Sequence, residues 1–364
     1  MAKKKPIIAV IGSHSALDVC RGAKDEGFET LVIVQSGRDK TYTEYYKTKG
    51  KLGCVDQCLE VEKFADILKP SIQDKLRKLN VIFIPHRSFE VYLNFDYAAI
   101  ENDFKIPMFG NRKLLKIEER GTTPNQYDLL DKAQIRYPKQ FSNPKDIDRL
   151  CLVKVLEKTR GFERAFFLVS SYKDYIKKTR ALLKKESFTA EQLARGVIEE
   201  FITGVQVNFN FFYSPLNKRL ELIGTDTRRQ TNLEGINKIP ADYQSEVIKN
   251  IGIKYEEAGH IAVTVLESLL EEAFAMGQRF VSATQSFGLP IIGPFGLQAV
   301  ITPGPPKKEI IVFDVSPRMP GSPGITATPY GSYLYGYTVS MGRRVAMEIK
   351  QAIKQNRLQE IISL

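Results

Sequence analysis

The sequence predicts an α/β fold for its first third and an α+β arrangement for the rest. Up to about residue 111, short apolar runs alternate with amphipathic segments of helical length. This alternation is typical of a doubly wound parallel sheet. From residue 112 onward, apolar runs follow one another across short turns, which favours antiparallel strands. A chain of 364 residues is long enough for two or three subdomains.

The first third opens with the apolar run 7–11, which stops at Gly12, and an amphipathic segment then extends to about Gly27. Four later apolar runs are expected to extend the parallel sheet, over residues 30–35, 58–61, 81–85 and 106–111. Two further helices are expected between these runs, over residues 64–79 and 89–101.

The second part begins with a charged helix over residues 112–120. An antiparallel pair is expected at 151–156 and 165–171, and a long charged helix follows over 172–187. The remaining elements are the strands of a larger sheet at 197–204, 207–215 and 220–228, a helix over 260–287, a hairpin formed by 292–304 and 308–318, and a final helix over 341–356.

The composition is that of an ordinary globular protein, with 43% hydrophobic and 26% charged residues. No apolar run is long enough to cross a membrane. The basic start MAKKK leads into a strand rather than into the apolar region of a signal peptide. We therefore expect a cytoplasmic protein without a membrane partner.

The spacing of the cysteines argues against a zinc site, and the distribution of the charges argues against nucleic acid. Cys54 and Cys58 form C-x-x-x-C, but no second Cys or His pair completes a zinc site, so reduced thiols are expected. A net charge of +11 is compatible with nucleic-acid binding. However, the basic residues are interspersed with acidic ones, and no nucleic-acid-binding motif is present. Nucleic acid is therefore not an expected partner.

The turn after the first strand carries polar groups that suit an anion. Gly12 is followed by Ser13, His14 and Ser15 at the expected start of a helix, where backbone N–H groups favour negative charge. A dinucleotide site would show G-x-G-x-x-G here, whereas the sequence has only Gly12. The pattern suits a small phosphate monoester better than a dinucleotide. An ordinary α/β turn with a polar cap is the alternative.

The hairpin near the C-terminus carries candidate metal ligands. Asp314, Ser316 and Arg318 alternate along one strand and are expected to line one pocket, with Gln298 on the other strand. A carboxylate, an amide oxygen and an arginine together suit Mg²⁺ that bridges nucleotide phosphates. A surface hairpin with a salt bridge is the alternative.

Two earlier strands offer groups for a nucleotide. Lys154, on the run 151–156, could reach a phosphate. The segment 197–204 places Glu199 and Glu200 before apolar residues. The backbone of that segment could hydrogen-bond an adenine at a hinge, with one of the two carboxylates near the ribose.

Taken in this order, the strand lysine, the segment 197–204 and the metal hairpin resemble the ATP-grasp superfamily. Several segments narrow the resemblance, which runs essentially end to end, to the archaeal formate-dependent AICAR ligases, also called FAICAR synthetases. These segments are GSHSALDVCRGAKDEGF (12–28), SGRD (36–39), IPHRSF (84–89), IPMFGNRKLL (106–115), IEEFITG (198–204), FFYSPL (211–216), LESLL (266–270), GPFGLQ (293–298) and FDVSPR (313–318). The implied domains are an N-terminal α/β domain over 1–120, an ATP-grasp small lobe over 121–197, and a large lobe with the metal hairpin over 198–364.

The resemblance also implies a reaction of purine biosynthesis. ATP phosphorylates formate to formyl phosphate. The 5-amino group of AICAR, a ribonucleotide monophosphate, then attacks the formyl carbon to give FAICAR, ADP and phosphate. The implied cofactors are ATP and Mg²⁺ or Mn²⁺, and the implied partners are these small-molecule substrates and further copies of the chain in a homo-oligomer. Such an ATP-dependent carbon–nitrogen ligase needs no side-chain nucleophile.

The family's motifs imply roles for individual residues when they are carried over position by position. His14, Ser88 and His260 are expected to bind the AICAR-like substrate. Gln298 and Asp314 are expected to hold the metal, and Asp314 and Arg318 are expected to act in catalysis. The residues expected to bind ATP are Lys154, Arg160, Glu199, Glu200, Phe201, Ile202 and Gln230.

The chain departs from the family pattern around the nucleotide. The family has a glycine-rich loop after the strand lysine. In this chain, residues 155–164 contain a single glycine, Gly161. Glycines let backbone N–H groups approach a phosphate closely. Three further positions also depart from the family. The family has glutamate at the position of Asp314, asparagine at that of His260 and glutamate at that of Gln230. Two alternatives therefore stay open: a paralogue that acts on a related aminoribonucleotide or acid, and a non-catalytic nucleotide-binding protein.

Overall fold

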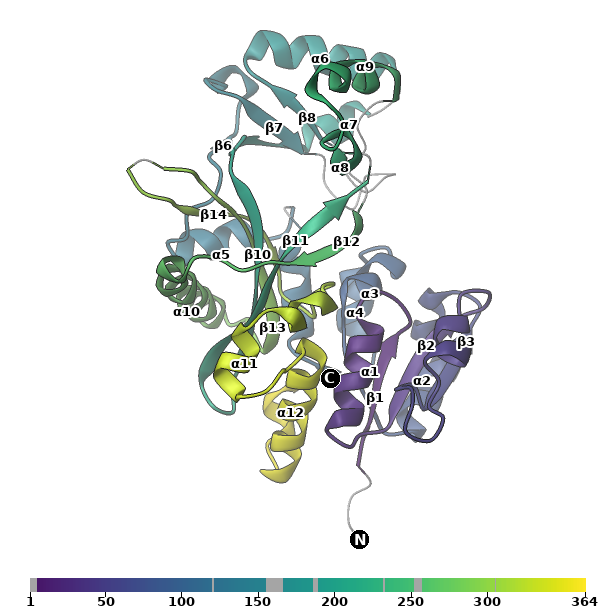
Figure 1. The fold of residues 1–364 in the computed structure, drawn as a ribbon. Helices are drawn as coiled ribbons and strands as arrows, with labels where there is room; N and C mark the ends of the chain where they lie inside the picture. The colour runs from purple at the N-terminus through teal and green to yellow at the C-terminus, as the bar shows by residue number, and fades with distance from the viewer. Residues whose placement is uncertain are drawn as a thin grey trace.

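The computed structural model describes residues 5–119, 121–154, 166–185, 189–231, 233–251, 257–304 and 306–364. The strands of these ranges form three sheets, with six, five and four strands. In Figure 1 the five-stranded sheet lies in the centre, the N-terminal six-stranded sheet lies beside it, and the four-stranded sheet lies above. Among the helices of these ranges, none combines the length and the apolar character that a bilayer crossing requires.

The six-stranded sheet is parallel from β1 to β5, which confirms the α/β prediction. Its order is β15-β5-β4-β1-β2-β3, and the C-terminal β15 joins the edge antiparallel to β5. β1 is buried at all five positions because core clusters lie on both of its faces. The strands are β1 (Ile7–Ile11), β2 (Thr30–Gln35), β3 (Gln57–Val61), β4 (Val81–Phe83), β5 (Met108–Phe109) and β15 (Ile362–Ser363). The helices are α1 (Ala16–Asp25), α2 (Pro70–Lys78), α3 (Arg87–Tyr92) and α4 (Tyr97–Asn102).

The single helix predicted over 64–79 is wrong. The chain forms a 3₁₀ helix, η2 (Phe64–Leu68), and then α2. Pro70 causes the break because it lacks an N–H group and disfavours a helical conformation in the residue before it. That residue, Lys69, is accordingly extended, with ψ 133°.

Two other helix predictions also need correction. The helix predicted over 89–101 is divided into α3 and α4 by Asn94 and Phe95, both of which have positive φ (52° and 55°). The helix predicted over 112–120 is a 3₁₀ helix, η3 (Arg112–Glu118). In both cases periodicity indicated the buried face but not the breaks in the backbone.

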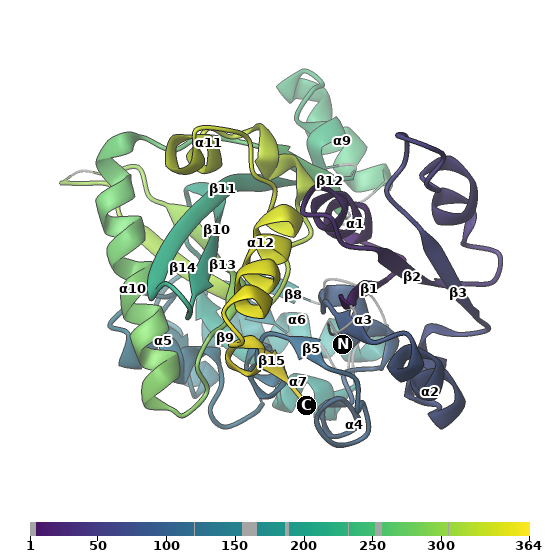
Figure 2. The ribbon, with the colours of Figure 1, turned by 90° about the horizontal axis from the view of Figure 1, so that it is seen from below.

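The last helix of the chain packs on the first one. α12 (Met341–Lys354) confirms the helix predicted over 341–356, and it lies against α1 (Figure 2). The close approach requires glycine in both helices, because a Cβ at Gly22 or at Gly342 would clash with the backbone of the other helix. Residues from both ends of the chain therefore share one core cluster.

The four-stranded sheet has the order β6-β9-β7-β8, and every pair is antiparallel. The pair predicted at 151–156 and 165–171 is confirmed as β7 and β8. The prediction that 197–204 belongs to the larger sheet is wrong, because β9 pairs with β7 and β6. An apolar run identifies a strand but not its partner. The elements are β6 (Gln140–Phe141), β7 (Cys151–Lys154), β8 (Phe166–Val169), β9 (Val197–Glu200), α6 (Tyr172–Lys184) and α7 (Ala190–Ala194).

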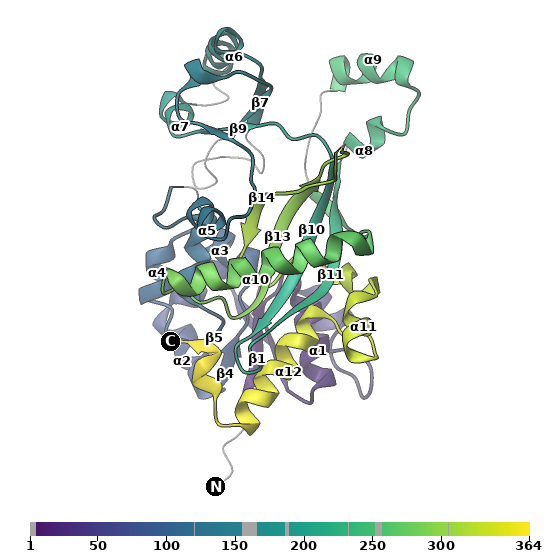
Figure 3. The ribbon, with the colours of Figure 1, turned by 90° about the vertical axis from the view of Figure 1, so that its left-hand side faces the viewer.

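The five-stranded sheet has the order β12-β11-β10-β13-β14 and is antiparallel throughout. The predicted hairpin of 292–304 and 308–318 is confirmed as β13 and β14. Helix α10 lies across one face of this sheet (Figure 3). In the core, Phe280 stacks on Phe295, and Phe295 stacks on Phe211. The strands are β10 (Val205–Ser214), β11 (Arg219–Gln230), β12 (Glu257–Ala262), β13 (Gly293–Ile301) and β14 (Ile310–Ser316). The helices around it are α5 (Gln126–Lys132), α8 (Leu233–Ile236), α9 (Ala241–Ile251), α10 (Leu270–Ser286) and α11 (Tyr330–Tyr335).

The helix predicted over 260–287 starts later than predicted. The first residues of that range belong to the edge strand β12, and α10 begins only at Leu270, after the 3₁₀ turn η6 (Glu267–Leu269). β-Branched residues dominate the stretch from Ile261 to Val265, and such residues favour strands over helices. His260 therefore lies on a strand.

Candidate functional site

A cavity of about 530 Å³ lies between the N-terminal domain and the five-stranded sheet. It is lined by the β1–α1 turn, by α3, by one face of the sheet, and by the segment after β14. Asp314, Ser316 and Arg318 share this cavity, as their spacing predicted. The predicted site residues that line it are His14, Ser88, His260, Gln298, Asp314 and Arg318. The cavity therefore brings the predicted acceptor residues and the predicted metal hairpin together.

Four polar residues cross the sheet in register on the cavity face. Asp314 on β14 is paired with Gln298 on β13, and Gln298 with Asn208 on β10. Asn208 is paired in turn with Asp226 on β11. Gln298 Nε2 donates to Asp314 Oδ2 (3.1 Å), and Asn208 Nδ2 donates to Asp226 Oδ2 (2.9 Å). Directly paired residues share a face, so the row forms a continuous polar floor.

Asp314 offers a carboxylate to Mg²⁺ carried by a nucleotide, and Gln298 would offer its Oε1 with the amide turned over, because its Nε2 now donates to Asp314 Oδ2. Gln298 Nε2 also donates to Ser316 Oγ (3.2 Å), which places a third polar group beside this pair. Across the described ranges, no group of three or more His, Cys, Asp or Glu side chains could hold a metal ion. An ion at Asp314 would therefore depend on phosphate oxygens. This suits Mg²⁺, which is usually held by one or two carboxylates together with substrate phosphates.

His260 lies beyond the other end of the polar row, between two carboxylates. Its Nδ1 hydrogen-bonds to Asp226, and its Nε2 hydrogen-bonds to Glu257 Oε1 (2.9 Å). Burial disfavours the charged ring, but the two carboxylates outweigh burial and raise the pKa of His260 to about 9. His260 is therefore a cation at neutral pH, and both of its N–H groups donate to carboxylates.

His14 lies in the turn where the sequence predicted an anion site. Its backbone is left-handed (φ 53°), and its ring packs so closely on Gly321 that a Cβ there would clash. Burial, together with nearby His86 and Arg318, lowers the pKa of His14 to about 3. The ring is thus neutral at neutral pH, and it can exchange a hydrogen bond with a ligand without adding charge.

Ser88 lies at the start of α3, and His86 holds that start in place. The Ser88 N–H donates to His86 Nδ1 (3.2 Å), so His86 Nε2 carries the proton and donates to the Ile11 carbonyl oxygen (3.0 Å). Ser88 Oγ donates to Ser13 Oγ (3.0 Å). His86 is fully buried and orients Ser88 rather than lining the cavity.

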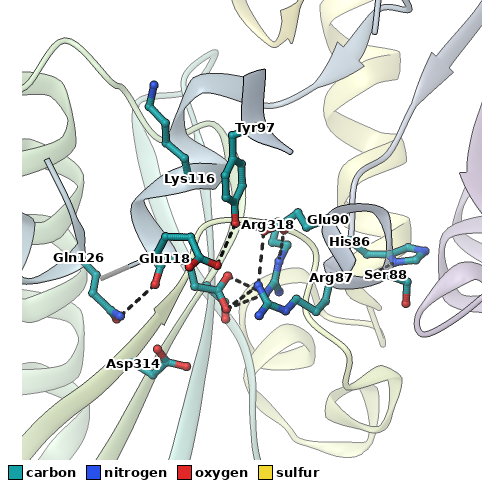
Figure 4. Close-up of polar contacts among 12 residues, drawn as sticks. His86, Arg87, Ser88, Glu90, Tyr97, Lys116, Glu118, Gln126, Asp314 and Arg318 are labelled. Carbon is teal, nitrogen blue, oxygen red and sulfur yellow. Dashed lines mark hydrogen bonds and ion pairs between the residues drawn. The ribbon is translucent and has the colours of Figure 1, made fainter. Parts of the chain in front are cut away.

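A buried cluster of charges lies at the cavity wall next to α3 (Figure 4). Arg318 Nε donates to Glu90 Oε1 (2.6 Å), and Arg318 Nη2 donates to Glu118 Oε2 (2.7 Å). Arg87 Nη1 lies 3.2 Å from Glu118 Oε1, and the Tyr97 hydroxyl donates to Glu90 Oε2 (3.2 Å). Burial raises the pKa of Glu118 to about 7, although the two arginines oppose this shift.

The residues predicted to bind ATP lie on or beyond the four-stranded sheet, and none of the described ones lines the cavity. Lys154 Nζ lies 2.5 Å from Glu199 Oε2, and the Tyr127 hydroxyl also donates to Glu199. Lys154 Nζ is 5.9 Å from the ring centroid of Phe313, the residue before Asp314. The structure thus places Lys154 and Glu199 together, close to the hairpin.

The residues that follow Glu199 do not join this pair. Glu200 points to the opposite side of β9, where Arg149 Nη1 donates to its Oε1 (3.1 Å). Phe201 is 40% exposed and Ile202 is half-buried in the connection to β10.

Two further residues predicted to bind ATP are separate from Lys154. Gln230 is the last residue of β11, and its backbone N–H donates to Glu234 Oε1 (2.9 Å). Arg160 and the glycine-poor loop 155–164, with Gly161, lie outside the described residues. The roles of all the residues predicted to bind ATP stay predictions.

The structure adds residues to the site that the sequence analysis missed. Asn208 and Asn210 alternate with buried Phe209 and Phe211, and polar residues on one face of a buried strand are a signal that could have found them. Other additions gave no local signal, because their partners are far away in the sequence; Arg318 is 228 residues from Glu90. The residues of this second kind are Arg87, Glu90, Glu118, Asp226, Glu257 and Ser322.

Known proteins similar to this chain match it along almost its whole length. The family model DUF1246, a protein of unknown function, matches residues 8–141, and DUF1297, a domain of unknown function, matches residues 174–363. The 5-formaminoimidazole-4-carboxamide-1-(beta)-D-ribofuranosyl 5'-monophosphate synthetase of Methanocaldococcus jannaschii is 38% identical over 99% of this chain and 96% of that protein. The protein of the same name from Methanothermobacter thermautotrophicus is 37% identical over 98% and 94%.

Solved structures also match the chain along most of its length. The crystal structure of an IMP biosynthesis protein PurP from Thermococcus kodakaraensis matches with a TM-score of 0.70 and 28% identity, over 98% of this chain and 100% of that one. The ADP complex of purK, an N5-carboxyaminoimidazole ribonucleotide synthetase, matches with a TM-score of 0.59 over 92% and 78%; at 13% identity it shows the fold alone. The predicted ATP-grasp fold is thereby confirmed. The chain belongs to the family of 5-formaminoimidazole-4-carboxamide-1-(beta)-D-ribofuranosyl 5'-monophosphate synthetases, as the resemblance in its motifs implied.

Proposed function

We propose that the chain catalyses the ATP- and Mg²⁺-dependent formylation of AICAR by formate. In the first step the γ-phosphoryl group of ATP passes to a formate oxygen, which gives formyl phosphate and ADP. In the second step the 5-amino nitrogen of AICAR bonds to the formyl carbon. The bond from that carbon to the phosphate oxygen breaks, and the nitrogen loses a proton. The products are FAICAR, ADP and phosphate.

The observation that carries this proposal is one cavity lined both by the residues proposed to bind the acceptor and by the hairpin proposed to bind the metal. His14 and Ser88 come from the N-terminal domain, and Gln298 and Asp314 come from the hairpin. A volume of about 530 Å³ lies within the usual range of ligand sites. Full-length relatives named as FAICAR synthetases support the acceptor, and the ADP complex of a protein with the same fold supports ATP as the donor.

The hairpin and the neighbouring strands would hold the nucleotide and its metal. Asp314 and Gln298 would bind Mg²⁺, which neutralises charge on the transferring phosphoryl group when it is bound. The Arg318 guanidinium, which lines the cavity, would stabilise negative charge on the acyl phosphate. The proposed ATP residues remain Lys154, Arg160, Glu199, Glu200, Phe201, Ile202 and Gln230.

Ser322 adds a candidate contact for AICAR to the cavity wall. Ser322 is 2% exposed and lines the cavity, and its hydroxyl has no hydrogen-bond partner in the described part of the chain. A buried hydroxyl without a partner is costly, and an oxygen of the nucleotide would satisfy it. Ser322 therefore joins His14, Ser88 and His260 as a proposed contact to AICAR.

The test is ADP release by the purified chain with ATP, Mg²⁺ and formate, with and without AICAR. We expect ADP release that depends on AICAR, with FAICAR identified by mass spectrometry. No ADP release, combined with AICAR binding in calorimetry, would instead support a non-catalytic binding protein. Release that depends on another acid or another aminoribonucleotide would support the paralogue.

We also propose that the chain forms a homo-oligomer, as the resemblance to the family implies, and that it lies in the cytoplasm, as the sequence analysis expects. Sedimentation velocity of the purified chain tests the assembly, and a single species of 41.3 kDa would contradict it.

A further inference from the structure

The helix that carries Ser88 also holds the guanidinium of Arg318. Helix α3 belongs to the N-terminal domain, whereas Arg318 follows β14 of the five-stranded sheet. Glu90 lies on α3 two residues after Ser88, and its carboxylate accepts from Arg318 Nε (Figure 4). A ligand at Ser88 and the arginine thus depend on the same short element.

The contacts on Arg318 are short, buried and directional. Its Nε donates to Glu90 Oε1 at 2.6 Å, and its Nη2 donates to both oxygens of Glu118 at 3.0 and 2.7 Å. The side chains of Arg318, Glu90 and Glu118 are only 5%, 0% and 7% exposed. Charge-assisted hydrogen bonds in so buried a place leave the guanidinium little freedom to rotate.

One guanidinium nitrogen is left over. Among the described residues Nη1 of Arg318 has no hydrogen-bond partner, and the side chain lines the cavity. Glu90 and Glu118 occupy the edge formed by Nε and Nη2. Nη1 is therefore the guanidinium donor that these contacts leave for a ligand.

From these contacts, and resting on the proposed function, we propose that Glu90 and Glu118 are positioning residues for Arg318. They fix the guanidinium so that Nη1 faces the acyl phosphate. Because both carboxylates belong to the segment before residue 120, the alignment of Arg318 depends on the domain that binds the acceptor. Acceptor binding and phosphate stabilisation therefore share one support.

Neither carboxylate depends on Arg318 alone. Glu118 also lies 3.2 Å from Arg87, and Glu90 also accepts from the Tyr97 hydroxyl. Removal of Arg318 therefore leaves each carboxylate with a partner, which reduces the cost of an unpaired buried charge. Substitutions at Arg318 and at either carboxylate can accordingly be combined and compared.

The test is a double-mutant cycle between Glu118→Gln and Arg318→Ala, measured as FAICAR formation. If Glu118 acts through Arg318, Glu118→Gln lowers kcat roughly ten- to a hundredfold in the wild-type background, because a small displacement of a catalytic group is that costly. In the Arg318→Ala background the same substitution changes kcat less than about twofold. The KM values for ATP and AICAR change little, because Glu118 contacts neither substrate in the proposed arrangement.

A matched control is available outside the cavity. Glu221 is a fully buried carboxylate that accepts from Arg344 Nε at 2.7 Å. Glu221→Gln should lower the melting temperature and leave kcat unchanged. Glu118→Asp keeps the charge and should restore part of the lost kcat. Where Glu118→Gln does not fold, Glu90→Gln replaces it in the cycle.

The outcomes separate this inference from the proposed function. A wild type that forms FAICAR, together with equal losses from Glu118→Gln in both backgrounds, overturns the inference and keeps the proposed function. An unchanged kcat in Glu118→Gln also overturns the inference and keeps the proposed function. A failure of both carboxylate variants to fold does the same, because the cluster would then be structural. A wild type that forms no FAICAR overturns both.

Discussion

Two buried arginines in this molecule are held by carboxylates, and they differ in what their contacts leave open. Arg344, on α12, donates from Nε and Nη2 to Glu221 (2.7 and 3.1 Å), and its Nη1 lies 2.9 Å from Glu348 Oε2 as an ion pair. All three of its nitrogens therefore lie beside protein carboxylates. Arg318 directs only Nε and Nη2 at carboxylates and lines the cavity, which Arg344 does not.

The difference shows that burial and ion pairing do not distinguish a structural cluster from a functional one. Both arginines are at most 6% exposed, and both have carboxylates within 3 Å. Arg344 also stacks 4.0 Å from the ring centroid of Phe212, so its cluster joins α12 to the five-stranded sheet. Buried ion pairs are weak evidence for stability in general. The two differ in that Arg318 lines the cavity and its Nη1 has no hydrogen-bond partner among the described residues.

Of all substitutions in the cavity that Arg318 lines, Asp314→Asn is expected to reduce activity the most. The substitution removes the carboxylate proposed to hold Mg²⁺, so FAICAR formation should fall by about a thousandfold or more. The affinity for AICAR should stay within about twofold, because AICAR is proposed to bind at the opposite end of the polar row. Steady-state kinetics and calorimetry measure the two quantities, and a fully active variant would show that the metal site is misplaced.

Substitution of the two arginines tests the comparison directly. Arg318→Ala should lower kcat about a hundred- to a thousandfold, the usual cost of removing a preorganised donor. Arg344→Met should leave kcat per folded molecule unchanged. It should lower the free energy of unfolding by about 1–3 kcal/mol, less than the loss of a sole buried partner costs, because Glu221 keeps Arg219 and Tyr335. Steady-state kinetics measure kcat, and denaturant titration measures the free energy of unfolding, for both variants. If Arg344→Met lost activity without losing stability, the two clusters would not differ as we describe.

The sequence predicted the order of strands well and their partners less well. The strands at 7–11 and 30–35 were predicted at their observed bounds, because buried parallel strands are continuous apolar runs between helices. The segment 197–204 was recognised as a strand but assigned to the wrong sheet. Pairing depends on contacts distant in the sequence, and periodicity carries no information about them.

The candidate site was predictable where its residues lie in one hairpin. Alternation placed Asp314 and Arg318 on one face, and the structure confirms that both line the cavity. Glu90 and Glu118 were missed because a carboxylate in an exposed helix and one that holds a buried arginine look alike in a sequence. His260 was expected in a helix, and the carboxylates around it emerge only from the pairing of β12 with β11.

A smaller effect is expected at His14, which lies in the cavity but outside both arginine clusters. His14→Ala should weaken AICAR binding about tenfold, the cost of one hydrogen bond in a buried site. ATP binding should change less than about twofold, because the predicted ATP residues lie near the four-stranded sheet. Calorimetry with each ligand measures both affinities. Equal losses for AICAR and ATP would instead assign His14 a structural role.

The smallest effect is a pH dependence of stability at His260, whose two ring nitrogens pair with Asp226 and Glu257. Its pKa is raised from an ordinary value of 6.5 to about 9 in the folded chain. The folded state therefore binds the proton more tightly than the unfolded state does. The stabilisation is fully present below about pH 6.5 and is lost as the pH rises through about 9.

Over this window the melting temperature of the wild type should fall by a few degrees more than that of His260→Asn. His14→Asn is the matched control above about pH 7.5, where the His14 ring is neutral in both the folded and the unfolded chain and should leave the wild-type pH dependence unchanged. An identical pH dependence in the wild type and in His260→Asn would mean that Asp226 and Glu257 do not hold a charged ring. Arg228, whose Nε lies 3.4 Å from Glu257 Oε2, would then offset the negative charge at this end of the cavity in place of His260.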